Sequence, residues 1–337
     1  MKKYVLKAGS TSLESLVIVE QDEPKVKPGE VLIRVRACSL NYRDQAVVTG
    51  NYFGGVLQND TVPLSDGAGE VVAVGDGVTQ FKAGDRVAGL FFQNWHDGPP
   101  NPAAGPALGA SGCDGMLAEY VALPERGVVK IAKSLSFEEA ATLPCAGVTA
   151  WNALMCGRKP IRAGDCVTVL GTGGVSMLAL GIAHAAGCHV VVTSSSDEKI
   201  ARAKKLGAAA GVNYRATPEW GPAAAAASHK GGADVVVEVG GAGTLAQSMQ
   251  AVGFNGEIAL IGVLTRAGDT TPHPLMMKGS SIRGIFVGNK AMATDLARAI
   301  DVSGMKPAID KVFPFKEAAE AYRYQTRGAF GKVVIKV

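Results

Sequence analysis

The apolar run Cys166-Val167-Thr168-Val169-Leu170 leads directly into the glycine turn Gly171-Thr172-Gly173-Gly174-Val175-Ser176. The next stretch, 177–186, has the pattern of a helix, and a second β-rich run, His189-Val190-Val191-Val192-Thr193, follows one helix length later. Strand, glycine turn, helix and strand in this order are typical of a parallel βαβ unit. The stretch therefore predicts a parallel α/β sheet in this part of the chain.

The glycine turn also has the features of a diphosphate-binding loop. Glycine adopts the conformations that a tight turn needs and lets the backbone approach a phosphate closely. The N-terminus of the following helix offers unpaired N–H groups and a partial positive charge. The spacing is Gly-x-Gly-Gly-x-x rather than the strict Gly-x-Gly-x-x-Gly, so an ordinary turn inside a parallel sheet is the alternative. We predict that a dinucleotide binds here, at Gly171, Thr172, Gly173, Gly174 and Val175.

Strand-like and helix-like patterns alternate from about residue 126 to residue 288. The strand candidates are Val167–Leu170, His189–Thr193, Asp234–Val239, Ile258–Ile261 and Ile282–Val287. Between them lie helix candidates such as Asp197–Leu206, with acidic residues in the first turn and lysines in the last, as the helix dipole favours. Continuous Val/Ile runs indicate strands buried on both faces, and hence a parallel sheet covered by helices.

The residues on either side of this region have a different sequence pattern. Residues 1–125 read as β-strands broken by turns, with strand candidates at Val31–Cys38, Glu70–Val74 and Arg86–Leu90. The stretch 94–115 is rich in Gly, Pro and Ala, and we expect a long functional or mobile loop. Residues 289–337 offer two helices and a final strand, too few for a domain, so we expect them to rejoin residues 1–125. The predicted cofactor-binding domain is then 126–288.

The composition is that of an ordinary globular protein and argues against several classes. The 337 residues are 47% apolar and 19% charged, and the net charge of +4 is too small and scattered to favour nucleic-acid binding. No apolar run is as long as a membrane-spanning helix, which needs about 20 residues, and the N-terminus lacks a signal-peptide pattern. The six cysteines contain no Cys-x-x-Cys pair, and we expect free thiols in a reducing cytoplasm.

Seven stretches in a fixed order carry a resemblance to a known family. They are Asn41-Tyr42-Arg43-Asp44, Ser65-Asp66-Gly67-Ala68-Gly69, Gly84-Asp85-Arg86-Val87, Leu117-Ala118-Glu119-Tyr120, Cys145-Ala146-Gly147-Val148-Thr149-Ala150-Trp151, Gly171–Ser176 and Gly331-Lys332-Val333-Val334. With them the chain resembles the medium-chain dehydrogenase/reductase superfamily over its whole length. The resemblance implies an α/β fold, in which a GroES-like β-rich domain joins a doubly wound Rossmann domain with a parallel sheet.

The resemblance also bears on metal binding. In zinc-dependent alcohol dehydrogenases, the positions that hold the catalytic zinc match Asn41, Ser65 and Cys145 of this sequence. A neutral amide and a hydroxyl are poor ligands for Zn²⁺, so we expect no catalytic metal. Cys145 is then expected to be a small, buried apolar residue. The lobe that carries a structural zinc in such enzymes matches 94–115, where Cys113 is the only cysteine, so we expect no structural zinc either.

Without a metal, hydride can still reach a substrate that conjugation already activates. The motif Leu40-Asn41-Tyr42-Arg43-Asp44 resembles that of zinc-free quinone oxidoreductases and enoyl reductases, which implies NADPH-dependent reduction of a quinone, an enone or a related activated carbonyl. Asn41 lies in that motif, and Tyr42 or Tyr52 could donate a hydrogen bond or proton to the substrate, or merely pack. Two alternatives stay open. One is an alcohol/aldehyde dehydrogenase-like NAD(P)-dependent oxidoreductase without zinc, and the other is an NADPH-binding sensor or crystallin-like protein without turnover.

The choice of cofactor depends on the end of the second strand. NAD-selective members of the family place a carboxylate there, and the matching residue here is Ser194. Ser194 and Ser195 can donate hydrogen bonds to the 2′-phosphate of NADP. Lys199 can add positive charge, and Tyr214 matches a further contact in NADPH-using relatives. We therefore predict NADPH, although serines at 194–196 could also simply cap the helix that begins near Asp197.

The family resemblance adds a last group of site residues. It places Thr149 and several strand-end residues near the nicotinamide, where open α/β sheets bind their ligands. Asp44 is more readily a structural hydrogen-bond acceptor, and Thr149 can instead bond back to its own helix. We expect Ser281–Val287 to form a sheet edge that pairs across a two-fold axis, as in dimeric relatives, giving a homodimer. The remaining predicted cofactor contacts are Asp44, Thr149, Gly262, Val263, Leu264, Phe286, Val287 and Lys332.

Overall fold

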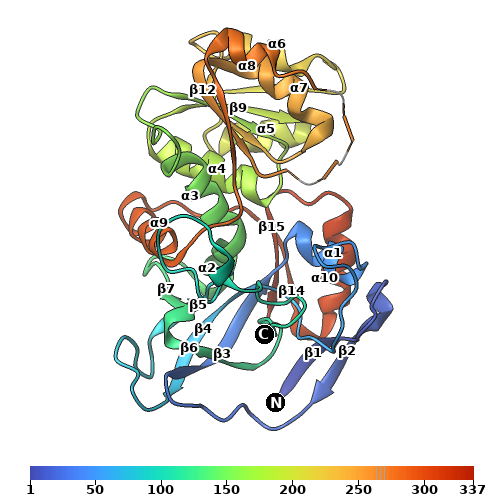
Figure 1. Ribbon diagram of the computed structural model, residues 1–337, viewed down its shortest axis with the longest axis vertical. Helices are drawn as coiled ribbons and strands as arrows, with labels where there is room; N and C mark the ends of the chain where they lie inside the picture. Colours follow the sequence, from blue (N-terminus) through green and yellow to red (C-terminus); the bar gives the residue numbers. More distant parts are fainter. Residues whose placement is uncertain (263, 266, 269) are drawn as a thin grey trace. The chain divides into compact units, whose positions relative to one another are not determined.

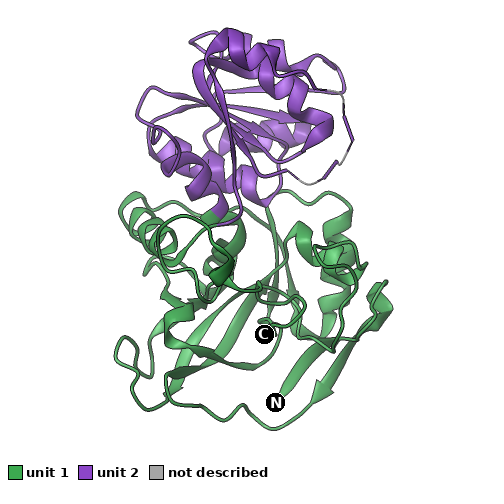
Figure 2. Cartoon of the chain, viewed as in Figure 1, with its two compact units in different colours: residues 1–148, 288–337 green, residues 149–287 purple. Residues whose placement is uncertain are grey.

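The computed structural model describes residues 1–262, 264–265, 267–268 and 270–337, which form two compact units (Figure 2). Unit 1 comprises Met1–Val148 and Gly288–Val337, and unit 2 comprises Thr149–Val287. The sequence predicts that the cofactor-binding domain begins at residue 126, whereas residues 126–148 lie in unit 1. In the part of the chain that the structure describes, no helix is both long and apolar enough to cross a membrane.

Unit 2 is built on the predicted parallel sheet. Its six strands have the order β10-β9-β8-β11-β12-β13, and every neighbouring pair is parallel. The strands are β8 (Cys166–Leu170), β9 (His189–Ser194), β10 (Ala210–Asn213), β11 (Ala233–Glu238), β12 (Val252–Leu260) and β13 (Ser281–Gly284). All five residues of β8 are buried, as its continuous apolar sequence requires of a central parallel strand.

Helices cover this sheet. They are α4 (Gly174–Ala185), α5 (Asp197–Lys205), α6 (Trp220–Ala227), α7 (Ala242–Ala251) and α8 (His273–Lys278), and a further helix, α3 (Val148–Met155), precedes β8 in the chain. Helices α6, α7 and α8 lie together (Figure 1) and bring Trp220, Met249 and Leu275 onto the strands to form the core of one face. Helices α4 and α5 pack against β8, β9 and β10. The carboxyl ends of β8, β9 and β10 therefore share one edge of the sheet, where a parallel sheet presents its ligand-binding turns.

Unit 1 is the β-rich part. It contains the pair β1 (Lys2–Leu6) and β2 (Leu16–Glu20) and a seven-stranded sheet of order β14-β15-β3-β4-β5-β7, with β6 pairing β3. The strands of the larger sheet are β3 (Glu30–Ser39), β4 (Asp66–Val74), β5 (Arg86–Gly89), β6 (Tyr120–Pro124), β7 (Val128–Lys130), β14 (Ile309–Pro314) and β15 (Lys332–Lys336). Strand β15 pairs antiparallel with β3, so the last segment of the chain completes this sheet.

The helices of unit 1 are α1 (Tyr42–Val48), α2 (Phe137–Ala140), α9 (Lys290–Ser303) and α10 (Ala318–Thr326), with a π-helical turn at Leu143–Gly147. Residues 126–148 belong here because β7 extends the seven-stranded sheet beside β5 and because α9 packs against β7 and the π-helical turn. The stretch 94–115 contains one short 3-10 turn, Pro102–Ala104, and is otherwise irregular, as its composition predicts.

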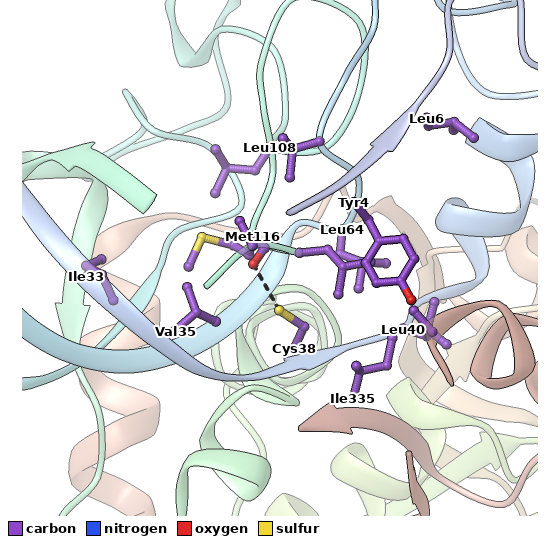
Figure 3. Packing of buried hydrophobic residues seen from close by; sticks show 14 of the residues in the cluster. Tyr4, Leu6, Ile33, Val35, Cys38, Leu40, Leu64, Leu108, Met116 and Ile335 are labelled. Carbon is purple, nitrogen blue, oxygen red and sulfur yellow. Dashed lines mark hydrogen bonds between the residues drawn. The ribbon is translucent and has the colours of Figure 1, made fainter. Parts of the chain in front are cut away.

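The core of unit 1 anchors the chain on either side of the candidate site. Leu40 and Leu64 are buried in the same cluster, Leu64 beside Met116 and Leu40 near Tyr4 and Ile335 (Figure 3). Each directly precedes a residue of interest, Asn41 or Ser65. The Sγ of Cys38 donates a hydrogen bond to the carbonyl oxygen of Met116 at 3.0 Å. Leu64 has a backbone φ of 69°, a value that residues other than glycine rarely adopt. Close packing thus fixes the backbone from which Asn41 and Ser65 project.

Candidate functional site

The glycine turn of unit 2 has the geometry of a phosphate-binding loop. Gly171 has a φ of +69°, and Gly173 is the extended N-cap of α4. A Cβ atom added to Gly171 or Gly173 would meet no atom within 4 Å, so the backbone of the turn faces open space. The Oγ of Ser176 donates to the carbonyl oxygen of Leu170 at 2.6 Å, which ties the start of α4 to the end of β8. Exposed turn backbone and the free N–H groups of a helix start fit a dinucleotide diphosphate.

The predicted 2′-phosphate residues gather at the ends of the next two strands. Ser194 ends β9 and pairs with Asn213 of β10, and its carbonyl oxygen accepts a hydrogen bond from the N–H of Tyr214 at 3.0 Å. The Oγ of Ser196 caps α5 by accepting from the N–H of Lys199, so the helix-capping alternative is correct for Ser196. Ser195 and Lys199 are half-buried, and Tyr214 is 40% exposed. Ser194 is 2% exposed and its Oγ accepts from the N–H of Ser196 at 3.4 Å, so Ser195 is the more accessible of the two remaining serines.

The other predicted contacts of unit 2 lie at strand ends and in α3. Gly262 follows β12, and a Cβ there would meet the backbone nitrogen of Gly241 at 2.3 Å, so the turns after β11 and β12 pack too closely for a side chain. Leu264 and Phe286 are about half exposed, Thr149 is buried, and Val263 lies outside the described residues.

Val287 has a strained backbone. Its φ is 54°, an uncommon value for a β-branched residue, and its carbonyl oxygen accepts a hydrogen bond from Nδ2 of Asn152 at 2.7 Å. Such strain is often found at functional positions, and the contact of Val287 with a cofactor stays a prediction.

Sequence reasoning missed Glu238, the last residue of β11. Its buried carboxylate accepts hydrogen bonds from the N–H groups of Gly240 and Gly241 at 2.6 and 3.0 Å. It also accepts from the hydroxyls of Thr244 and Ser248. One side chain thus holds the turn after β11 and the first part of α7. A charged residue directly after the apolar run Val235-Val236-Val237 was the available signal.

Unit 1 contains a group of polar side chains, which we call the polar cluster: the buried Asn41, Arg43, Asp44, Ser65, Asp66 and Lys332, and the half-buried Cys145. Strands β4 and β15, helix α1 and the π-helical turn supply or flank its members. The sequence predicts Asn41, Asp44 and Lys332 as site residues, but gives no reason to group them with Asp66.

The ammonium group of Lys332 is the charge at the centre of the polar cluster. This side chain is 2% exposed, and its Nζ donates to the carbonyl oxygen of Leu40 at 2.8 Å and to Oδ1 of Asn41 at 2.6 Å. It also forms an ion pair with Oδ2 of Asp66 at 3.6 Å. The other carboxylate oxygen of Asp66 accepts from the hydroxyl of Ser65 at 2.9 Å. Lysine, asparagine, aspartate and serine are therefore linked in one buried network.

Arg43 and Tyr52 form the second part of this site. The guanidinium of Arg43 lies over the rings of Tyr52 and Phe91, at 4.7 and 4.8 Å from their centroids, and donates to the carbonyl oxygen of Leu108. Burial raises the pKa of the Tyr52 phenol, while the neighbouring Arg43 opposes that rise. Tyr42, by contrast, is 53% exposed. The Tyr52 phenol is thus protonated at neutral pH and can act as a donor.

Asp44 has a structural role and an unusual acidity. Its Oδ2 accepts from the N–H of Asn41 at 2.6 Å, which fixes the first turn of α1. Burial raises the pKa of Asp44 to about 6, although the guanidinium of Arg43, 3.6 Å away, favours the charged form. The carboxylate of Asp44 therefore takes up a proton in the range of a weakly acidic solution.

The donor set of the polar cluster does not fit a zinc ion. The Oδ1 atom of Asn41, the oxygen that a metal would need, accepts from a lysine ammonium, and that cation would repel a second one. Burial raises the pKa of the Cys145 thiol well above its usual range, with Asp66 adding to the rise, which disfavours the thiolate that zinc requires. Among the residues that the structure describes, no three His, Cys, Asp or Glu side chains are grouped as a metal would need.

Comparisons with known proteins agree with this architecture. The family described as alcohol dehydrogenase GroES-like domain matches residues 27–133, and the family described as zinc-binding dehydrogenase matches residues 174–302. A zinc-type alcohol dehydrogenase-like protein of Schizosaccharomyces pombe is 44% identical, over 99% of each chain. A quinone oxidoreductase of Sus scrofa is 28% identical, over 93% of this chain and 90% of its own.

A solved structure leads to the same family. It is described as an alcohol dehydrogenase of Sinorhizobium meliloti, is 40% identical, covers 100% of both chains and superposes with a TM-score of 0.90. The resemblance drawn from the sequence motifs and the predicted fold class are both confirmed. The chain belongs to the medium-chain dehydrogenase/reductase superfamily and is an NAD(P)-dependent oxidoreductase of that type.

Proposed function

We propose that this protein is a zinc-independent, NADPH-dependent reductase of quinones, enones or related activated carbonyls. The observation that carries the proposal is the position of the Lys332 ammonium, which donates a hydrogen bond to Oδ1 of Asn41 and forms an ion pair with Asp66. Asn41 is one of the positions that resemble zinc ligands in the alcohol dehydrogenases, and here it is bonded to a cation instead. A site built in this way lacks a Lewis acid and needs a substrate that is already activated.

Unit 2 would hold the cofactor. The turn Gly171–Val175 and the start of α4 would bind the diphosphate, and Ser194, Ser195, Lys199 and Tyr214 would contact the 2′-phosphate. When bound, NADPH supplies a hydride. No carboxylate stands at the end of β9, where one would repel the 2′-phosphate, and this supports NADPH over NADH.

Unit 1 would supply the groups that bind the substrate oxygen. The Nδ2 amide of Asn41 is buried and has no hydrogen-bond partner among the described residues, so it can donate to a carbonyl or quinone oxygen. The phenol of Tyr52, kept protonated by its raised pKa, can donate a hydrogen bond or a proton to the same kind of oxygen. Such donors stabilise the negative charge that develops when hydride reaches the conjugated carbon.

An alcohol or aldehyde dehydrogenase-like activity is the second candidate. It is favoured by the name of the Schizosaccharomyces pombe relative, at 44% identity. An alcohol must lose its hydroxyl proton as hydride leaves, which a zinc ion would promote and the cationic Lys332 would not replace directly. A cofactor-binding protein without turnover would show neither activity.

The proposed function is tested by NADPH consumption with 1,4-benzoquinone, 2-cyclohexenone and an enoyl thioester, with ethanol and NADP as the reverse arm. Reduction of at least one conjugated acceptor without ethanol oxidation supports the proposal. Ethanol oxidation without reduction of any conjugated acceptor favours the dehydrogenase. Tight NADPH binding without oxidation by any acceptor favours the protein without turnover.

The proposal includes a homodimer in the cytoplasm. Strand β13 is one of the two outer strands of the six-stranded sheet, and an outer strand can pair with a second copy of itself. The six cysteines are free thiols, which suits a reducing compartment. Sedimentation velocity would show the dimer, and a monomer at micromolar concentration would contradict it.

A further inference from the structure

Asn41 can offer a substrate either its amide oxygen or its amide NH₂, and only the NH₂ stabilises a developing negative charge. The orientation of a carboxamide is decided by its hydrogen-bond partners. A lysine ammonium has donors and no acceptor. Because Nζ of Lys332 lies 2.6 Å from the side chain of Asn41, the atom facing it must be the oxygen. The NH₂ group is then directed away from Lys332.

The neighbouring carboxylate makes this orientation matter. Asp66 is fully buried, and its Oδ2 faces the same ammonium at 3.6 Å. Without the lysine, this carboxylate would be a strong acceptor beside an amide with an unpaired NH₂. The amide of Asn41 would then turn its NH₂ to Asp66 and present its oxygen to the substrate. The ammonium prevents this by donating a hydrogen bond to Oδ1 of Asn41 and by pairing its charge with that of Asp66.

We propose that Lys332 is a positioning residue that holds the carboxamide of Asn41 with its NH₂ group toward the substrate oxygen. Lys332 acts through Asn41 and does not touch the substrate. The backbone of Asn41 is fixed independently by its N–H bond to Asp44, so Lys332 sets only the side-chain orientation. The expected effect on catalysis rests on the proposed reductase function. The orientation of the Asn41 amide can be observed without any activity.

The first test is spectroscopic. In protein labelled with ¹⁵N-asparagine, the side-chain signal of Asn41 is assigned by its loss in Asn41→Ala. In Lys332→Met the amide protons of Asn41 should shift downfield, because the NH₂ becomes bonded to the Asp66 carboxylate. In Lys336→Met they should not move, since Lys336 lies on the same strand with its side chain 66% exposed. An unchanged Asn41 signal in Lys332→Met overturns the proposal.

The second test is kinetic and uses the acceptor that the wild type reduces. Lys332→Met should lower kcat about 10- to 100-fold, because an oriented donor is lost. The Kd for NADPH should stay unchanged, because on this proposal the buried Nζ of Lys332 bonds to Leu40 and Asn41 and is not the cofactor contact that the family resemblance implies. Lys332→Arg should restore part of kcat. When Lys332→Met is added to the Asn41→Ala variant, the further decrease in kcat should be less than about threefold, because Lys332 acts through Asn41. Full additivity of the two losses overturns the proposal.

Two outcomes keep the tests separate. If Lys332→Met fails to fold because Asp66 is left unpaired, Lys332→Met/Asp66→Asn removes both charges together. In that variant the Asn41 amide is released rather than turned toward a carboxylate, so kcat should still fall by at least about threefold, and a wild-type kcat overturns the proposal. If the wild type reduces no acceptor, the reductase function fails, while the NMR shift still decides the orientation.

Discussion

Replacing Asp44 by asparagine should change how the stability of unit 1 depends on pH. Asp44 is buried, and its pKa is raised from 3.8 to about 6. The folded state therefore binds this proton more tightly than the unfolded state. The resulting stabilisation is complete below the unfolded pKa and is lost as the pH rises through 6. The asparagine of the Asp44→Asn variant would be neutral throughout and could still accept the N–H bond of Asn41.

The size of the effect follows from the shift. A rise of about two pKa units, at about 1.36 kcal/mol per unit, is worth about 3 kcal/mol. Relative to Asp44→Asn, the wild type should lose up to about 3 kcal/mol of unfolding free energy between about pH 4 and pH 7.5. The comparison with the variant removes the contribution of the other carboxylates, which titrate in both proteins.

Urea unfolding followed by tryptophan fluorescence measures this difference. Trp95 lies buried in unit 1, whereas Trp151 and Trp220 lie in unit 2, so both proteins are compared in a Trp151→Phe/Trp220→Phe background. A free-energy difference between wild type and variant that stays constant across this pH range would refute the reasoning. So would a wild type that gains stability relative to the variant as the pH rises.

Three further predictions concern the cofactor contacts, the proton donor and the buried carboxylate of unit 2. Lys199→Ala should weaken the binding of NADPH about tenfold and that of NADH much less, because a charge-assisted contact to the 2′-phosphate is lost. Isothermal titration measures both affinities, and equal losses would contradict the NADPH assignment. Tyr52→Phe should lower kcat about tenfold at an unchanged Kd for NADPH, and more than Tyr42→Phe does, since Tyr52 is the partly buried phenol; the reverse order would make Tyr42 the donor. Glu238→Ala should destabilise unit 2 by about 4 kcal/mol, because two N–H groups and two hydroxyls lose their acceptor, and Glu238→Gln by clearly less; equal effects in urea unfolding would refute the role of that network.

Local patterns predicted the sheet of unit 2 because its strands are continuous apolar runs. The expected strand His189–Thr193 is one residue shorter than β9, and the expected helix Asp197–Leu206 is one residue longer than α5. Strand β10, Ala210–Asn213, was missed because Ala, Gly and Asn carry little strand preference. Its place is set by pairing with β9 rather than by its own residues.

The polar cluster could be predicted only in part. The motif resemblance singled out Asn41, Ser65 and Cys145, but the bond from Lys332 to Asn41 joins residues 291 positions apart. Such a contact depends on β15 returning beside β3, which no local pattern shows. The left-handed backbones of Leu64 and Val287 were likewise beyond sequence reasoning, because tertiary packing imposes them against the preference of the side chain.

Metal content and activity, measured on one sample, decide most directly whether the site works without zinc. The protein is dialysed against 1,10-phenanthroline, its zinc is measured by plasma mass spectrometry, and NADPH oxidation with the preferred conjugated acceptor is recorded before and after. We expect zinc far below one atom per chain and an unchanged rate after dialysis. One zinc per chain, with a rate that disappears on chelation and returns on adding Zn²⁺, would contradict a zinc-independent reductase.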